Sequence, residues 1–215
     1  MSPSRDVPPP PDPGTFEPLI TVWPESKELW RCHPARYGAT EFNRRAGTPG
    51  RFRPIRALGR VCPTLYAADS EVGAVSETAF HDVPIAAPTK QVRLSRFDDV
   101  LLSTMAPRRE LRLARLHGHG FHRLGAGRRE LIESEADRYP QLAVWGQALH
   151  DCPAQPDGIL WRSRHYDDSY ACLLFGDRIS RRELELVAPP LPLALGHGLE
   201  LVQQLAEDAD ITLVV

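Results

Sequence analysis

Three stretches of the sequence contain side chains suited to binding or transforming a charged small molecule. The first, residues 29–55, is rich in arginine; the second, residues 65–82, holds a tyrosine and a glutamate; the third, residues 158–175, holds a serine after an apolar run. Arginine keeps its charge, and its planar fork of N–H donors matches phosphates and carboxylates. A glutamate can stabilise a developing positive charge, and a tyrosine ring can stack on a cation. If the fold brings the three stretches together, they form a binding or catalytic site.

Each of these side chains, taken alone, has an ordinary structural explanation. Glu77 could pair with a surface arginine, and Arg31 and Arg51 could cap backbone carbonyls. Tyr66 stands in an apolar run, where a tyrosine is usually a core aromatic with its hydroxyl hydrogen-bonded. Ser163 could simply end a strand or form a turn. The functional interpretation depends on all five occurring together and in this order.

Common nucleotide and metal motifs are absent from the sequence. No GxGxxG follows a predicted strand, and there is no GxxxxGK[ST] loop, GxSxG elbow or HExxH helix. His117, His119 and His122 form the densest group of potential metal ligands, but no acidic residue or cysteine lies close to them in sequence. We interpret this group as a solvated, glycine-rich loop. The sequence therefore predicts no metal and no tightly bound cofactor.

Composition and charge narrow the class of protein. The 215 residues, with 42% hydrophobic and 25% charged side chains, are typical of one globular domain. A net charge of −2 gives no general attraction to nucleic acid or to anionic membranes. The arginines of residues 108–115 are not interleaved with aromatic side chains, which favours a solvated helix face. We expect no direct binding to nucleic acid.

The sequence also predicts a cytoplasmic protein. No apolar run reaches 18 residues, and the first residues lack the apolar core of a signal peptide. No pair of cysteines forms a CxxC motif, so we expect reduced, partly buried thiols. The four are Cys32, Cys62, Cys152 and Cys172.

Local patterns predict the elements that must hold the candidate side chains. Residues 63–68 form a short apolar run typical of a buried strand, and Asp69 or Ser70 then supplies a helix N-cap. The following helix carries Glu77 and ends before Pro84. Elsewhere we expect strands at 158–161, 170–175 and 211–215, helices at 108–117, 130–150 and 199–207, and a loop at 118–127. Strands and helices mix without regular alternation, which indicates an α+β class.

The three stretches resemble those of the RES-domain family, named for its arginine, glutamate and serine. Members begin with a WR or YR element and a glycine–arginine–aromatic turn, continue with an LYxAxSxxxAxxE strand and helix, and end with a G-[ILV]-x-[WY]-x-S strand. The resemblance covers roughly residues 29–175. The matching functional positions are Arg31, Arg51, Tyr66, Glu77 and Ser163.

The resemblance implies a fold, an activity and a partner. The fold would be a single α+β domain with a mixed sheet, similar to ADP-ribosyltransferase toxins and flanked by helices. Members of the family break NAD⁺, some by phosphorolysis, and usually act beside a cognate antitoxin. We therefore expect Glu77 and Ser163 to be catalytic, and Arg31, Arg51 and Tyr66 to bind NAD⁺. Inorganic phosphate is a possible co-substrate.

The chemistry of NAD⁺ accounts for these residue types. Nicotinamide leaves as a neutral molecule, so one carboxylate can suffice where glycosidases use two. Glu77 could stabilise the oxocarbenium-like charge, Arg31 and Arg51 suit the pyrophosphate, and Tyr66 could stack on the nicotinamide ring. Ser163 could hydrogen-bond to the nicotinamide or to the incoming nucleophile.

Two other functions remain open from the sequence: transfer of ADP-ribose to a protein, and an inactive module that only binds a partner. We expect residues 1–18 to form a proline-rich flexible tail, residues 19–188 a RES-like catalytic domain, and residues 189–215 a C-terminal extension of one helix and one strand. His81 and Tyr37 lie near the candidate positions, and we leave them outside the catalytic set.

Overall fold

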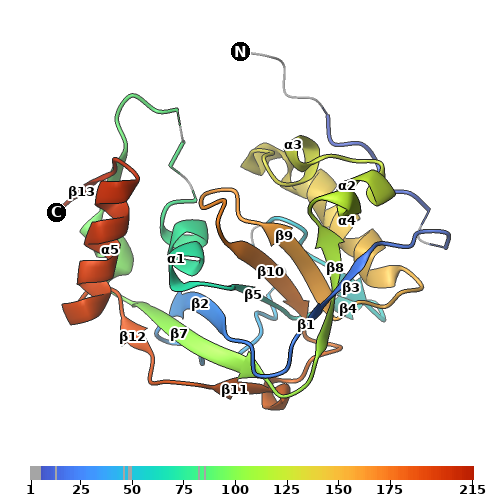
Figure 1. Cartoon of the computed structure of the whole chain (residues 1–215), viewed down its shortest axis with the longest axis horizontal. Coiled ribbons are helices and arrows are strands. Elements are labelled where there is room, and N and C mark those ends of the chain that lie inside the picture. The colour runs from blue at the N-terminus through green and yellow to red at the C-terminus, as the bar shows by residue number, and fades with distance from the viewer. Residues whose placement is uncertain (1–5, 13, 46, 48–49, 82, 85) are drawn as a thin grey trace.

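A mixed β-sheet forms the centre of the computed structural model, which describes residues 6–12, 14–45, 47, 50–81, 83–84 and 86–215 (Figure 1). Within these residues, the sheet contains nine strands in the order β1-β8-β9-β10-β5-β2-β7-β11, with β12 also paired to β7. Their bounds are β1 Ile20–Trp23, β2 Leu29–Pro34, β5 Thr64–Ala68, β7 Val100–Pro107, β8 Leu111–Leu116, β9 Gly158–Arg162, β10 Tyr170–Phe175, β11 Leu184–Leu186 and β12 Leu191–Pro192. The β8–β9 pair is parallel, and the pairs on either side of it are antiparallel.

Helices cover two ends of this sheet. Figure 1 shows α1 and α5 together at one end, and α2, α3 and α4 at the other. The helices are α1 Glu71–Ala79, α2 His119–Leu124, α3 Arg128–Leu131, α4 Tyr139–Asp151 and α5 Gly196–Asp208, with 3-10 turns at Leu94–Phe97, Ala136–Arg138 and Arg181–Glu183. Two small sheets pair β3 Arg56–Ala57 with β4 Arg60–Val61, and β6 Gln91–Arg93 with β13 Thr212–Val214. The α+β class predicted from the sequence is confirmed.

The strand β5 and the helix α1 form as their sequence predicts. Ser70 is the N-cap of α1, and its hydroxyl accepts a hydrogen bond from the Gly73 backbone at 3.0 Å. A side chain at Gly73 would collide with the hydroxyl of Ser169, because its Cβ would lie 2.1 Å from that oxygen. Glycine therefore lets α1 lie close to the start of β10, which fixes the direction in which Glu77 points.

The helix predicted for residues 108–117 is wrong, because Leu111–Leu116 form the strand β8. In β8, Leu111 and Leu113 are fully buried while Arg112 between them is exposed. This alternation has the two-residue period of a strand, and pairing on both sides with β1 and β9 stabilises it. The loop expected at 118–127 is also partly wrong, because it contains the short helix α2.

Residues 6–12 and 14–18 pack on the core, contrary to the flexible tail expected there, whereas residues 1–5 and 13 lie outside the described residues. Val7 and Phe16 are buried, and the Phe16 ring meets the Trp145 ring edge-on at 6.3 Å. The indole N–H of Trp145 donates to the Pro8 carbonyl at 2.7 Å. Two apolar side chains and one buried indole donor therefore hold this segment on α4.

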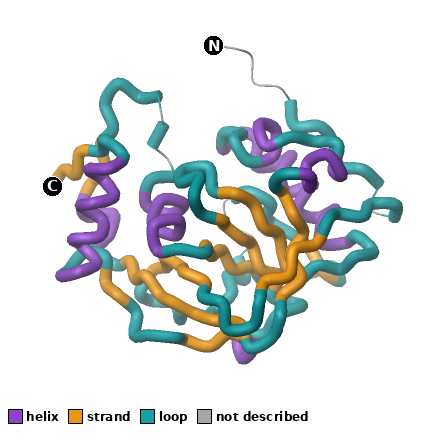
Figure 2. The backbone as a smooth tube through the Cα atoms, viewed as in Figure 1, coloured by secondary structure: helices purple, strands orange, loops and turns teal. Residues whose placement is uncertain are grey.

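The C-terminal segment also packs against the rest of the domain. The strand β12 pairs with β7, and Val202, Leu205 and Ala206 of α5 are buried in a cluster that includes Val75 of α1. The predicted final helix and strand are confirmed as α5 and β13. Figure 2 shows that the last helix runs beside α1.

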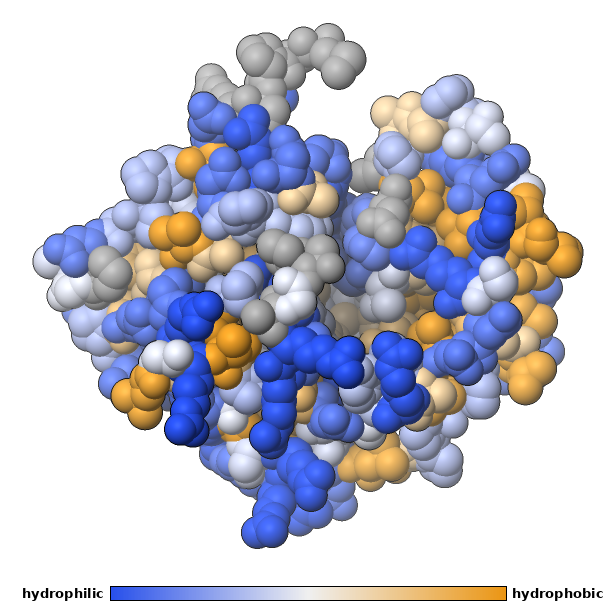
Figure 3. Space-filling view, turned by 180° about the vertical axis from the view of Figure 1, so that it is seen from behind, coloured by the Kyte–Doolittle hydropathy of each residue, from blue (hydrophilic) through white to orange (hydrophobic). Residues whose placement is uncertain are grey.

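The face of the molecule opposite to that seen in Figure 1 is mostly hydrophilic. Seen from behind, polar side chains cover most of the face, and apolar residues form smaller groups (Figure 3). In the described part of the chain, no helix has the length and apolar character needed to span a membrane.

Candidate active site

A cavity of about 360 Å³ opens between the two groups of helices. Its walls come from β2, β5, α1, the loop that leads to Arg53, the start of α4 and the residues that follow β9. Four of the five predicted residues line it: Arg31, Arg51, Tyr66 and Glu77. The fold thus brings together side chains that are up to 46 residues apart, from position 31 to position 77.

Glu77 is held by one oxygen. Its Oε1 accepts hydrogen bonds from the Ser163 hydroxyl at 2.6 Å and from the Arg164 backbone N–H at 2.8 Å. Among the described residues, no donor bonds to Oε2. The carboxylate is therefore fixed in orientation and keeps one oxygen for a ligand.

Ser163 lies behind Glu77, outside the lining of the cavity. It is fully buried, and its hydroxyl donates to Glu77 while accepting the backbone N–H groups of His165 at 3.2 Å and Tyr166 at 3.0 Å. These three hydrogen bonds occupy the Ser163 hydroxyl. Its position suits orienting the glutamate rather than touching a ligand.

Arg51 is 8% exposed and supports the cavity wall. Its guanidinium donates to the carbonyls of Leu131 at 3.0 Å and Ser134 at 3.2 Å, and lies over the Tyr139 ring at 5.5 Å. Burial lowers the pKa of Arg51. A guanidinium has five N–H donors, so those not used by carbonyls can serve a ligand.

Arg31, in β2, is similarly anchored by backbone carbonyls. One of its nitrogens donates to the carbonyls of Ala39 at 2.7 Å and Glu41 at 2.8 Å. Burial lowers the pKa of Arg31 to about 10, so it keeps its charge at neutral pH. The anchoring fixes the fork at the edge of the cavity.

Tyr66 joins two parts of the site. Its hydroxyl donates to the Arg51 carbonyl, and its ring meets Trp161 edge-on at 6.3 Å. Burial raises the pKa of Tyr66. Trp161 also lines the cavity, and its buried indole N–H has no acceptor among the described residues.

Sequence reasoning missed several residues that line the same cavity. Arg164 donates to the Ser134 carbonyl at 3.2 Å and to Glu135 at 2.6 Å, while its backbone N–H holds Glu77. His165 follows it, and burial lowers the pKa of His165 although the charge of Glu77 opposes this. Both belong to the polar run after β9, whose position beside Ser163 was the available signal.

The cavity is therefore strongly cationic. Arg53 completes a set of four arginines around one glutamate. The set is Arg31, Arg51, Arg53 and Arg164. Several fixed guanidinium groups in one cavity favour a ligand with phosphate groups.

Comparisons with known proteins identify the family and the fold. No curated protein matches the chain. A chain from the crystal structure of the M. tuberculosis MbcT–MbcA toxin–antitoxin complex has a similar fold, with a TM-score of 0.61 and 19% sequence identity over 87% of this chain and 92% of that chain. The model of the RES domain matches residues 28–195, which include all five predicted site residues. The chain belongs to the RES-domain family.

Proposed function

We propose that the protein cleaves NAD⁺ at the bond between nicotinamide and ribose. The observation that carries this proposal is the carboxylate of Glu77, held through Oε1 with Oε2 left for a ligand, in a cavity lined by arginines. A fixed anion beside fixed cations suits a substrate that has a pyrophosphate and develops positive charge on a sugar.

In this reaction the C–N bond to nicotinamide breaks, and its electron pair stays on the ring nitrogen. The ring was a pyridinium, so it leaves neutral and needs no proton. The free oxygen of Glu77 stabilises the positive charge on the ribose, while Ser163 and the Arg164 N–H keep the carboxylate in place. A nucleophile oxygen then forms the new bond to the anomeric carbon.

The other lining residues bind the substrate. Arg31 and Arg51 hold the pyrophosphate with the donors that their carbonyl contacts leave over. Tyr66 and Trp161 form the aromatic wall for the nicotinamide ring. In this proposal NAD⁺ is the substrate and not a tightly bound cofactor.

Phosphate is the nucleophile that this cavity favours over water. Arg53 and Arg164 add cationic donors beyond those assigned to the pyrophosphate. A bound nucleophile gains from its high effective concentration. Phosphorolysis would give nicotinamide and ADP-ribose-1″-phosphate, whereas hydrolysis would give ADP-ribose.

The test is to incubate the purified protein with NAD⁺, with and without millimolar phosphate, and to identify the products by mass spectrometry. We expect phosphate to accelerate the loss of NAD⁺ and ADP-ribose-1″-phosphate to accumulate. ADP-ribose formed at a phosphate-independent rate would make the protein a hydrolase. ADP-ribose attached to a protein would make it a transferase, and intact NAD⁺ under every condition would leave a partner-binding module.

A cognate antitoxin is the partner we propose, because the chain with the similar fold was solved in a toxin–antitoxin complex. Expression of the protein in a bacterium should stop growth and lower cellular NAD⁺, in the cytoplasm where NAD⁺ is abundant. Coexpression of the neighbouring gene should restore both. Normal growth with unchanged NAD⁺ would argue against a toxin.

A further inference from the structure

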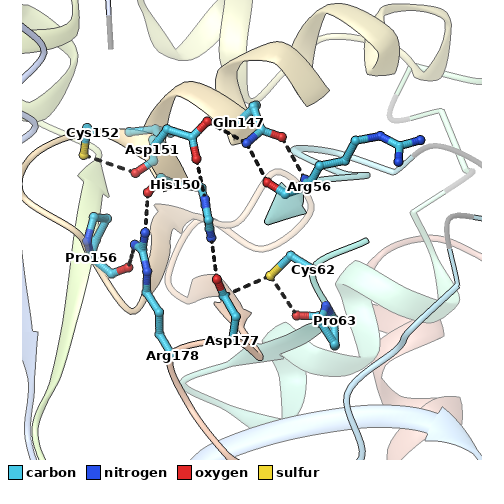
Figure 4. Close-up of polar contacts among 11 residues, drawn as sticks. Arg56, Cys62, Pro63, Gln147, His150, Asp151, Cys152, Pro156, Asp177 and Arg178 are labelled. Atoms are coloured by element: carbon cyan, nitrogen blue, oxygen red, sulfur yellow. Dashed lines mark hydrogen bonds and ion pairs between the residues drawn. The ribbon is translucent and has the colours of Figure 1, made fainter. Parts of the chain in front are cut away.

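Three potential metal ligands meet on the side of the sheet that carries α4, outside the lining of the cavity (Figure 4). Cys62 follows β4, His150 lies in the last turn of α4, and Asp177 follows β10. One ligand atom from each lies within 4.8 Å of the others. Residues far apart in sequence are thus placed around one point.

Hydrogen bonds already connect the three side chains. Asp177 accepts the Cys62 thiol at 3.0 Å through Oδ1 and the His150 Nε2–H at 2.9 Å through Oδ2. Cys62 and His150 are almost fully buried, at 2% and 5% exposure, while the Asp177 side chain is 30% exposed. Solvent therefore reaches the cluster from the Asp177 side.

A second carboxylate orients the histidine. Asp151 bonds to His150 Nδ1 at 2.7 Å, and its other oxygen accepts the Gln147 amide at 2.7 Å. Histidines that bind metals in proteins typically give their second ring N–H to a carboxylate in this way, which fixes the ring and makes the ligating nitrogen more basic. Figure 4 shows this chain from Gln147 to Asp177.

We propose that Cys62, His150 and Asp177 bind a zinc ion. Sulfur, imidazole nitrogen and carboxylate oxygen are the ligands that Zn²⁺ combines, whereas Mg²⁺ and Ca²⁺ prefer oxygen alone. The three side chains fill three tetrahedral positions, and water from the exposed side fills the fourth.

The charges balance when zinc enters. Both ring nitrogens of His150 face carboxylates, so one proton lies between Nδ1 and Asp151 and one between Nε2 and Asp177. Zinc would take the place of the proton at Nε2 and of the Cys62 thiol proton, and both protons would go to solvent. The proton between Nδ1 and Asp151 stays.

A zinc ion at this site would stabilise the elements that build the cavity, at positions outside the cavity lining. It connects the entry to β5, which carries Tyr66, with the end of α4, which begins at Tyr139, and with the end of β10. Zinc there would act on stability, so its effect can be measured independently of any NAD⁺ chemistry.

The experiment uses the full chain stripped of metal with a chelator, followed by titration with Zn²⁺ and, separately, with Co²⁺. We expect one zinc per chain, a rise in Tm of roughly 5 °C or more at a hundredfold excess over Kd, and a thiolate-to-cobalt charge-transfer band. X-ray absorption should show a zinc–sulfur distance of about 2.3 Å. Mg²⁺ should change none of these.

Variants distinguish zinc binding by the cluster from zinc binding by another cysteine. Cys62→Ala should lose the charge-transfer band, whereas Cys152→Ala, which removes another buried cysteine outside the cluster, should keep it. Asp151→Asn should weaken zinc binding about 10–100-fold. If the wild-type chain gives no charge-transfer band and no Tm rise with zinc, or if Cys62→Ala binds zinc as tightly as wild type, the cluster is a hydrogen-bonded network and the proposal is wrong.

Discussion

At the scale of single residues, the site consists of one carboxylate and the groups that hold it. The sequence predicted Glu77 and Ser163 because their types and spacing match a family pattern, and the structure brings them to 2.6 Å. The sequence could not indicate that the Ser163 hydroxyl would also accept hydrogen bonds from two backbone N–H groups, because those bonds depend on how the polar run after β9 turns. Roles that arise from backbone geometry need the fold.

Replacing Glu77 with glutamine tests the carboxylate. The change keeps the shape but removes the negative charge, so we expect nicotinamide release to fall by about 10²–10³-fold with an unchanged circular dichroism spectrum. Glu71→Gln, on the first turn of the same helix, is the matched control and should keep wild-type turnover. A Glu77→Gln enzyme with near-normal turnover would remove this residue from the mechanism.

Replacing Arg31 or Arg51 with lysine tests the binding of the pyrophosphate. Lysine keeps the charge but cannot present two parallel donors, so each variant should bind NAD⁺ at least about tenfold more weakly. Calorimetry in a Glu77→Gln background prevents turnover during the titration. Arg112→Lys, on the exposed face of β8, should bind normally. Unchanged affinity in both site variants would make these arginines purely structural.

At the scale of elements, prediction succeeded where the local sequence decides the structure. The capped helix α1 and the apolar strands β5 and β10 form as expected, because their signals lie within a few residues. It failed at residues 108–117, where leucines at 111, 113 and 116 fit a helix face or a strand face. Pairing with β1 and β9, which comes from distant sequence, decides for the strand. The cluster of Cys62, His150 and Asp177 was missed for the same reason.

The N-terminal segment gives a prediction at this scale. Phe16 is 3% exposed against Trp145, so Phe16→Ala should destabilise the protein by about 3 kcal/mol. For a chain of this size that corresponds to a fall in Tm of roughly 6–12 °C. Val22→Ala, at a residue that is 50% exposed, serves as the control and should change Tm little. Equal Tm values for the two variants would show that the segment does not contribute to stability.

At the scale of the whole molecule, one half-buried histidine makes the stability of the fold depend on pH. Burial and the charges of Arg115 and Arg162 lower the pKa of His117 from 6.5 to about 4. Its ring packs on Tyr170 at 4.8 Å, and its Nε2 has no partner among the described residues. The folded protein therefore takes up this proton at a lower pH than the unfolded chain does.

The sign of the pH effect follows from this difference. Above pH 6.5 neither state binds the proton, whereas between 6.5 and about 4 the unfolded chain binds it and the folded protein does not. Stability from His117 is thus lost as pH falls through this range. We expect Tm to fall between pH 7 and pH 4, and His117→Gln to lose less over the same interval. Parallel curves for the two proteins would contradict the assignment.

The packing of α5 on α1 shows that the folded domain extends beyond the residues that match the family model. The family match ends at residue 195, yet Val202, Leu205 and Ala206 beyond it cover the helix that carries Glu77. A protein trimmed to the matched residues would expose that apolar surface to water and aggregate. A change in α5 could therefore shift the helix that carries Glu77 without altering any residue that lines the cavity. The last helix is thus a position from which the candidate site can be changed without a substitution inside it.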